Sequence, residues 1–283
     1  MKKRFFLFPA VAGVAAYFSF SQVFTLSDEP LLTTIDHQTI SSPQLHCFHS
    51  DSETSLDVDG QLDLLVWNIY KQNRSQWQQA LTSLSQNKQL LLLQEASMTQ
   101  DMKRWILNSG WYGNQANAFK AFDTPAGVLN LSKDTPLLAC AYMTTEPWLR
   151  LPKSAIYARY PLSNGQTLAV VNVHAVNFTL GVKAYREQLH QLEMALSQHQ
   201  GPIVIAGDFN SWSEKRLSAL KKALLPLNLE EVRYAPDERK RFITGYPLDH
   251  VFFRGLTLKS AEAPINDASD HNPLVVRFQV KAK

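Results

Sequence analysis

The stretch Ile203-Val204-Ile205-Ala206-Gly207-Asp208-Phe209-Asn210 indicates how the chain is built. Four consecutive apolar residues, three of them β-branched, are typical of a short strand that is buried on both faces. The residues that follow come where such a strand ends and a turn begins. Asp208 or Asn210 could cap a following helix. Because a strand is rigid, its end can also hold such side chains in a cleft.

Four other apolar runs lead into a polar residue from the same short list of Asn, Glu, Asp and His. They lead into Asn68, Glu95, His174 and the pair Asp270-His271. Each of these residues alone could be a simple turn former. Five such positions in one chain favour a shared site instead.

Between residues 62 and 280, short apolar runs are separated by turn residues and amphipathic stretches. Strands are predicted at residues 62–69, 89–94, 127–131, 137–143, 155–160, 167–173, 203–206, 250–253 and 274–280. Helices are predicted at residues 75–86, 99–108, 182–199 and 214–225. Because strands and helices do not alternate regularly, the order argues against a Rossmann fold or an α/β barrel. It favours two packed sheets flanked by helices.

The residue types at the strand ends suit a metal-dependent hydrolase. Carboxylate and amide oxygens, in a chain with only two cysteines, suit Mg²⁺ or Mn²⁺ better than zinc. Two histidines beside such a cation suit acid and base work on a water molecule and a leaving oxygen. This combination indicates hydrolysis, most naturally of a phosphate ester. The sequence has no Gly-rich phosphate loop or nucleophile elbow, which counts against an NTPase or a serine hydrolase.

Six short motifs resemble, in order, those of the endonuclease/exonuclease/phosphatase superfamily. They are residues 67–69, 93–95, 172–174, 207–210, 248–252 and 269–273. Residues 66–71 and 173–178 also resemble the uncharacterised bacterial YafD-like branch. The resemblance implies an α/β (α+β) fold, a four-layer αββα sandwich in which two mixed β-sheets pack face to face between helices. The catalytic domain is expected to span residues 61–283.

The resemblance also implies roles for the residues of the metal site and for the water. Glu95 is expected to be the main metal ligand, with Asn68 and Asp270 beside it. Asp208 is expected to position or deprotonate the attacking water, and Asn210 to hold the phosphate.

Two histidines are expected to complete the catalytic set. His271, oriented by Asp249, would stabilise or protonate groups around the scissile phosphate. His174 matches a position that is histidine in deoxyribonuclease-like and sphingomyelinase-like members and tyrosine in abasic-site endonucleases. The resemblance therefore favours the first two groups over abasic-site repair.

Substrate contacts are expected from Lys71, Arg74, Lys153 and Asn177, which could meet phosphate oxygens. Residues 239–241 are all basic and could steer a polyanion. Each of these charges could equally be an ordinary solvated side chain.

The amino-terminal part divides into two segments. Residues 1–27 carry three basic residues followed by an uncharged apolar stretch, which is typical of a signal peptide or a membrane anchor, although a hydrophobic tail packed on the domain is an alternative. Residues 28–60 carry seven acidic and no basic residues and are predicted to be a linker of low order. Cys47 could bond to Cys140 in an exported chain, but Cys140 lies in an apolar run and is interpreted as a core thiol.

The leading functional hypothesis is a monomeric, Mg²⁺- or Mn²⁺-dependent phosphodiesterase of nuclease type. Residues 61–283 hold 25 basic and 18 acidic residues, which favours nucleic acid over a neutral head group. The alternatives are a lipid head-group phosphodiesterase, a phosphomonoesterase and a non-catalytic nucleic-acid-binding module. Membrane association through residues 5–26 would place the protein at the membrane or on its periplasmic side, with a cytoplasmic location as the alternative.

Overall fold

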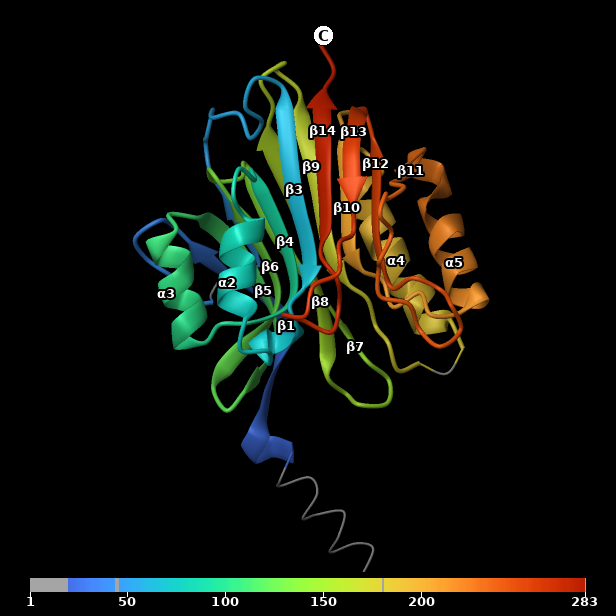
Figure 1. The fold of residues 1–283 in the computed structure, drawn as a ribbon. Helices are drawn as coiled ribbons and strands as arrows, with labels where there is room; N and C mark the ends of the chain where they lie inside the picture. Colours follow the sequence, from blue (N-terminus) through green and yellow to red (C-terminus); the bar gives the residue numbers. More distant parts are fainter. Residues whose placement is uncertain (1–19, 44–45, 180, 283) are drawn as a thin grey trace, which may run out of the picture.

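Two seven-stranded β-sheets face each other in the computed structural model, which describes residues 20–43, 46–179 and 181–282 (Figure 1). The first sheet has the strand order β1 (Phe24–Ile35), β5 (Tyr112–Ala121), β6 (Thr124–Ser132), β4 (Leu90–Ser97), β3 (Gln61–Asn68), β14 (Leu274–Val280), β13 (Leu256–Glu262). The second has the order β11 (Glu230–Glu231), β12 (Asp249–Arg254), β10 (Ile203–Asp208), β9 (Thr167–His174), β8 (Pro152–Pro161), β7 (Leu138–Thr145), β2 (Cys47–His49).

Helices cover the outer face of each sheet. The first sheet carries α2 (Trp77–Leu84) and α3 (Gln100–Asn108), and the second carries α4 (Lys183–Leu196) and α5 (Glu214–Leu224). The fold also contains two short 3₁₀ turns, η1 (Tyr70–Gln72) and η2 (Leu225–Leu227). The predicted four-layer αββα sandwich with two mixed sheets is therefore confirmed.

The alternation of side chains along β3 shows how the layers are held together. Leu64 and Val66 point into the core between the two sheets, while Leu65 and Trp67 point toward the helices of the first sheet. Because successive side chains of a strand point to opposite faces, a run of apolar residues serves both cores at once.

The strand directions bring the predicted site residues to one end of the sandwich. β3 is parallel to β4, and β9 is parallel to β10. The hydrogen bond between Asn68, the last residue of β3, and Asp208, the last residue of β10, brings the carboxyl ends of both pairs together at this end. β12 and β14 run antiparallel to β10 and β3 and begin at the same end. It is the lower end of the molecule in Figure 1.

The prediction of a low-order linker over residues 28–60 is wrong for the residues that form β1 and β2. β1 pairs antiparallel with β5 from Leu31 to Ile35, and its buried residues Leu32 and Ile35 enter the core. The acidic residues Asp28 and Glu29 hid this strand in the sequence, because they fall where the register between β1 and β5 shifts. β1 begins at Phe24, so residues 24–27 of the segment predicted as a signal peptide or anchor belong to a strand of the first sheet.

The interpretation of Cys140 as a core thiol is also wrong. Cys47 of β2 lies opposite Cys140 of β7 in the antiparallel register, and the two residues form a disulfide. The bond links a segment that the sequence assigned to the linker directly to the second sheet.

Most of the predicted signal peptide or anchor, residues 1–19, lies outside the described residues. In the part of the chain that is described, no helix is both long and apolar enough to cross a membrane.

Candidate active site

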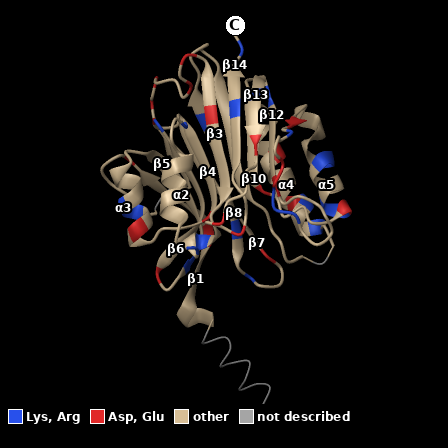
Figure 2. Ribbon diagram, in the orientation of Figure 1, with Lys and Arg blue, Asp and Glu red and all other residues tan. Residues whose placement is uncertain are grey.

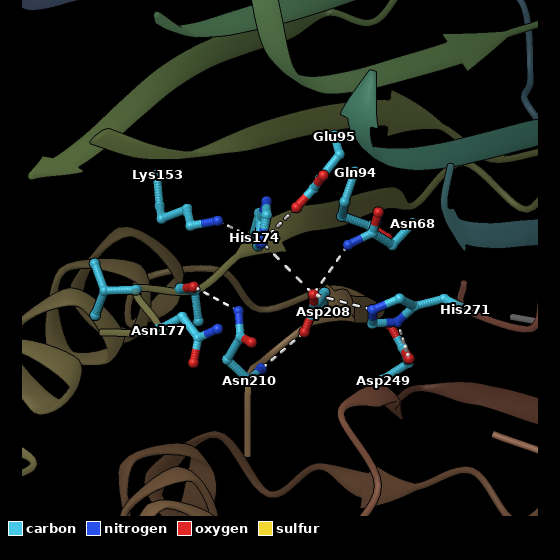
Figure 3. A network of polar contacts seen from close by, with 12 residues as sticks. Asn68, Gln94, Glu95, Lys153, His174, Asn177, Asp208, Asn210, Asp249 and His271 are labelled. Atoms are coloured by element: carbon cyan, nitrogen blue, oxygen red, sulfur yellow. Dashed lines mark hydrogen bonds and ion pairs between the residues drawn. The ribbon is translucent and has the colours of Figure 1, made fainter. Parts of the chain in front are cut away.

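Asp208 occupies the centre of a polar network at the end of the sandwich (Figure 3). It is the last residue of β10 and lies opposite His174 on β9 and Asp249 on β12, so the sheet register itself places three site residues in one row. Asn68, from the other sheet, donates its Nδ2 to Asp208 Oδ2 at 3.0 Å. Asp208 therefore joins the two sheets at the site. It is only 2% exposed, and a hydrogen bond to a buried carboxylate is stronger than one in water.

His271 is held against Asp249. Its Nδ1 lies 2.7 Å from Asp249 Oδ2, and its Nε2 lies 3.9 Å from Asp208 Oδ2. The backbone is fixed as well, since the Trp67 indole donates to the His271 carbonyl at 2.8 Å. Burial by itself lowers the pKa of His271, but the carboxylates of Asp249, Asp208 and Asp270 outweigh it and raise the pKa to about 10.

His174 has the opposite electrostatic environment. Its Nε2 lies 2.9 Å from Lys153 Nζ, 3.5 Å from Asp208 Oδ2 and 3.8 Å from Glu95 Oε1. Since an ammonium group can only donate, Nε2 accepts from Lys153, and the ring proton is on Nδ1. Burial first, and the charge of Lys153 next, lower the pKa of His174 to about 4.

Glu95 is aimed into the site by an irregularity of β4. The register between β4 and β6 shifts between Leu93 and Ala96, and Glu95 has a φ of 52° at that point. A bulge of this kind turns a side chain out of the regular alternation. Lys71 forms an ion pair with the Glu95 carboxylate. Burial raises the pKa of Glu95, but His174 in the protonated form that it takes in acid, together with Lys71 and Lys153, outweighs burial and lowers this pKa to about 2.

Asn210 follows Asp208 on a tight, left-handed turn. Its φ is 48°, which asparagine tolerates better than most residues, and its backbone N–H donates to Asp208 Oδ1 at 2.9 Å. Its side-chain Nδ2 donates to the Ala175 carbonyl at 2.9 Å. Asn177 lies alongside, where its backbone N–H donates to Glu146 and its Oδ1 accepts from Trp212.

Arg216 of α5 stabilises this turn, and its role was not predicted from the sequence. Although it is only 1% exposed, its guanidinium donates to the carbonyls of Asn210 and Val176 and stacks on the ring of Tyr185 at 3.9 Å. A signal was available in the sequence. Arg216 is three and four residues before Ala219 and Leu220 and therefore lies on the apolar face of α5.

A cavity of about 600 Å³ opens at this site. Ten of the twelve sequence-predicted site residues line it, namely Asn68, Lys71, Glu95, Lys153, His174, Asn177, Asp208, Asn210, Asp270 and His271. Asp249 lies behind His271 and contacts the cavity only through it. Glu146, which is buried, also lines the cavity, and nothing in its sequence context marks it.

The structure does not bring Arg74 to the site. Its side chain is exposed and does not line the cavity. The preceding residues Tyr70, Lys71 and Gln72 all have positive φ, so the chain turns away directly after Lys71. Arg74 therefore carries no part of the proposed phosphate contacts.

In the basic segment 239–241, the two arginines form ion pairs within the fold. Arg239 has a side chain that is 9% exposed and is held by Asp237 at 2.8 Å, and Arg241 pairs with the same carboxylate. Of the three, Lys240 alone lines the cavity.

A second hydrogen-bonded chain near the site has the residue types of a catalytic triad. Ser211 Oγ lies 2.8 Å from His250 Nε2, and His250 Nδ1 lies 2.7 Å from Glu231 Oε1. Ser211 is completely buried, so no substrate can reach it. As the strand alternation predicts, His250 faces away from the cavity and has a structural role.

The oxygen donors at the cavity fit a hard divalent cation. Glu95, Asp270 and Asp208 supply carboxylates and Asn68 an amide, a donor set that Mg²⁺ and Mn²⁺ accept. The low pKa of Glu95 keeps its carboxylate ionised at neutral pH, as a metal ligand requires. Asp208, Asp249 and His271 also bring one ligand atom each within 4.8 Å of one another, but Asp249 and His271 already bind each other.

The ordered motifs and this geometry agree with a direct sequence comparison. A sequence model described as the Endonuclease/Exonuclease/phosphatase family matches residues 65–271. The chain belongs to this family. This membership supports metal-dependent hydrolysis of phosphoesters as the general chemistry of the site, and it confirms the resemblance stated from the motifs.

Proteins with higher sequence identity assign the chain to a narrower group within the family. A "UPF0294 protein" of Vibrio cholerae serotype O1 (El Tor Inaba) is 57% identical over 283 residues, which covers 99% of each chain. Another, from Yersinia enterocolitica serotype O:8, is 45% identical over 218 residues, or 77% of this chain and 84% of the relative. The predicted membership of the YafD-like branch, to which the UPF0294 proteins correspond, is confirmed.

Solved structures share the fold at low sequence identity. The human Nocturnin catalytic domain with bound sulfate has a TM-score of 0.60 at 18% identity and covers 80% of this chain and 96% of its own. ANGEL2, a 2′,3′-cyclic phosphatase, has a TM-score of 0.61 at 15% identity, covering 78% and 95%. D. rerio TDP2 with a single-stranded DNA product has a TM-score of 0.59 at 14% identity, covering 78% and 100%.

Proposed function

We propose that this protein hydrolyses phosphodiester bonds with the help of Mg²⁺ or Mn²⁺ held by Glu95, Asn68 and Asp270. One observation carries the proposal: the Asp208 carboxylate stands between two imidazoles, with His174 Nε2 at 3.5 Å and His271 Nε2 at 3.9 Å, at the wall of a cavity (Figure 3). When bound, the cation would polarise a phosphate oxygen and favour ionisation of a water molecule.

Asp208 is the group that would position and deprotonate the attacking water. Its Oδ1 accepts from the Asn210 backbone and its Oδ2 from Asn68, so the carboxylate is fixed in one orientation. A base held in this way can take a proton without first reorganising.

His271 is the group that would meet the leaving side of the phosphate. Because its Nδ1 contacts Asp249, the other ring nitrogen, Nε2, faces the cavity. From there it can donate a proton or a hydrogen bond to a phosphate oxygen. Lys71, Lys153, Asn177 and Asn210 line the same cavity and supply further donors for phosphate oxygens.

Nucleic acid is the substrate class that the net charge favours, since the domain carries more basic than acidic residues. A specific observation supports a lipid head-group phosphodiester as the second candidate. The residues that line the cavity include the apolar side chains Phe119, Leu149, Leu151, Phe178 and Phe242. Such side chains can hold acyl or glyceryl carbons, although Trp212 and the phenylalanines can also stack on bases.

The first test is hydrolysis of a bis-aryl phosphate diester by the purified full chain with Mg²⁺ or Mn²⁺. We expect activity that requires the metal and is lost in both Glu95→Ala and His271→Ala. Inactivity with every divalent metal, or activity that survives both substitutions, would overturn the proposal. A side-by-side panel of single- and double-stranded DNA, RNA, sphingomyelin, inositol phosphates and a phosphomonoester then identifies the substrate class.

We also propose that the catalytic domain works outside the cytoplasm. The Cys47–Cys140 disulfide supports this location, because structural disulfides persist in oxidising compartments. Mass spectrometry of protein that is alkylated in intact cells tests the idea. A bonded pair in the periplasmic or membrane fraction is expected, whereas two alkylated cysteines in the cytoplasmic fraction would contradict it.

A further inference from the structure

In the part of the chain that the structure describes, the exposed phenylalanine and tryptophan side chains are not scattered over the surface. In residues 20–43, 46–179 and 181–282, four Phe or Trp side chains count as exposed: Phe122 at 75%, Trp148 at 62%, Phe178 at 55% and Phe242 at 44%. Burying a phenylalanine or tryptophan removes a large apolar area from water, so a folded protein gains by covering such residues.

The strand connections place all four at the end of the sandwich where the active-site cavity opens. Phe122 lies at the turn between β5 and β6, and Trp148 lies between β7 and β8. Phe178 follows β9, and Phe242 precedes β12. β6 and β8 begin at the end where β4 and β9 finish, so these four connections share one end of the fold.

Two exposed aliphatic residues extend the same surface. Leu149, beside Trp148, is 48% exposed, and Ile243, beside Phe242, is 94% exposed. We call Phe122, Trp148, Leu149, Phe178, Phe242 and Ile243 the apolar rim. Leu149, Phe178 and Phe242 also line the cavity, which makes the rim continuous with the cavity mouth.

Basic residues accompany the rim. Lys120 lies near the β5–β6 turn, Arg150 follows Leu149, and Lys240 precedes Phe242 and lines the cavity. Acidic residues occur at this end too (Figure 2). Asp123 is the acidic residue of the β5–β6 turn. Asp237 forms ion pairs with Arg239 and Arg241, which neutralise its charge. Exposed apolar side chains with basic neighbours suit the interface of an anionic bilayer.

We propose that the apolar rim docks this protein on the surface of an anionic phospholipid bilayer, with the active-site cavity facing the membrane. The described chain enters the fold at the same end, because Phe24 at the start of β1 pairs with Ala121 next to the β5–β6 turn (Figure 1). Residues 5–19, which precede it in sequence, contain no charged residue. The apolar rim therefore lies at the end of the sandwich where the described chain begins. The docking itself is a property of the four loops and is independent of the hydrolysis proposed above.

The proposal is tested with the full chain and a triple variant, Phe122→Ser, Trp148→Ser and Ile243→Ser. None of these three residues lines the cavity. Each loses an apolar side chain that can enter the interface, so partition onto vesicles of equimolar phosphatidylethanolamine and phosphatidylglycerol should fall at least about tenfold in a sedimentation assay. Hydrolysis of the soluble bis-aryl diester should stay unchanged, so a failure of docking and a failure of catalysis are distinguishable.

A matched control comes from exposed apolar residues elsewhere on the fold. Val58, Met194 and Leu225 are 58%, 57% and 74% exposed and belong to none of the four loops. The variant Val58→Ser, Met194→Ser and Leu225→Ser should bind vesicles like the native chain. Equal vesicle binding by native and rim variant would overturn the proposal and leave the amino-terminal sequence as the sole contact. Unchanged vesicle binding with reduced binding of single-stranded DNA would overturn it in favour of a nucleic-acid surface.

Discussion

His271 and Asp249 form a buried pair in which Nδ1 of the imidazole lies 2.7 Å from Oδ2 of the carboxylate, and the two residues are 7% and 2% exposed. Asp249 is the first residue of β12, and His271 lies just before β14, so the pair connects the two sheets. Its geometry holds one ring nitrogen toward the carboxylate and leaves the other for the cavity.

Replacing Asp249 by Asn should lower kcat for the phosphodiester by about 10²-fold or more, since the imidazole loses the charge that orients it. KM should change little, because Asp249 does not line the cavity. Steady-state kinetics at saturating metal measure both constants. An Asp101→Asn variant is the control, since Asp101 is exposed on α3. A purely structural role would be indicated by a lower unfolding free energy with an unchanged kcat.

Metal removal should abolish activity, and Mg²⁺ or Mn²⁺ should restore it. In Glu95→Gln the loss of one carboxylate charge should raise the metal concentration for half-maximal activity by about tenfold or more. Thermal unfolding gives a second readout, because a cation that binds only the folded state raises Tm. We expect this rise in the native chain and a much smaller one in Glu95→Gln. Equal rises in both proteins would exclude Glu95 as a ligand.

Arg216→Lys should reduce kcat while the fold is retained. A lysine keeps the positive charge, but its single nitrogen cannot serve the carbonyls of Asn210 and Val176 together as the guanidinium does. Leaving one buried carbonyl without a donor costs about 1–3 kcal/mol, which urea unfolding can measure. Exposed Arg104 offers a control substitution. Kinetics identical to those of the native chain would show that the turn at Asn210 needs no support from Arg216.

Acid should destabilise the native chain more than Glu231→Gln. Burial raises the pKa of Glu231, but the hydrogen bond and charge of His250 and the charge of Arg239 outweigh it and hold the pKa below its ordinary 4.5. A carboxyl with a lower pKa in the folded state stabilises the fold above its unfolded pKa, and this contribution is lost as pH falls through the folded value. Urea unfolding between neutral pH and pH 3 should therefore give a steeper loss for the native chain. Parallel curves would contradict this assignment.

Removal of the disulfide should lower the unfolding free energy by about 2–4 kcal/mol, because the bond closes a long loop in the unfolded chain. The two cysteines are separated by 93 positions in the sequence. Urea unfolding of the native chain with and without a reductant measures the effect. The double variant Cys47→Ser, Cys140→Ser should already show the lower value and should not respond to the reductant. A response of that variant would reveal an unrelated effect of the reductant.

The residues of the candidate site could be predicted from the sequence better than some of the strands. Residues such as Asp208 and His174 could be predicted because each ends an apolar run that forms a strand in almost any context. β5 could not, because its buried positions include Asn114, Gln115 and Asn117, and the polar sequence shows no alternation. The four predicted helices are all present and differ from the prediction mainly at their ends, as expected from fraying and local capping.

Residues whose role depends on partners far away in the sequence could not be predicted from the sequence. Arg216 and Glu146 are buried because they bind the backbone of Val176 and Asn177, which are 40 and 31 positions away in the sequence. Conversely, Arg74 was predicted to contact the substrate because it is close to Asn68 in sequence. The positive φ angles of residues 70–72 turn the chain away from the site before Arg74. Sequence proximity predicts a shared site only when the intervening backbone is regular.

The position of β1 has a practical consequence for shortening the protein. A polypeptide beginning at residue 61 would contain every residue of the proposed active site but would lack β1 and β2. β5 and β7 would then become the outer strands of their sheets and would lose the eight and three residue pairs that β1 and β2 make with them. Such bare edges recruit strands from other molecules. Self-association of the shortened protein would thus be a product of the truncation and would say nothing about how the native chain assembles.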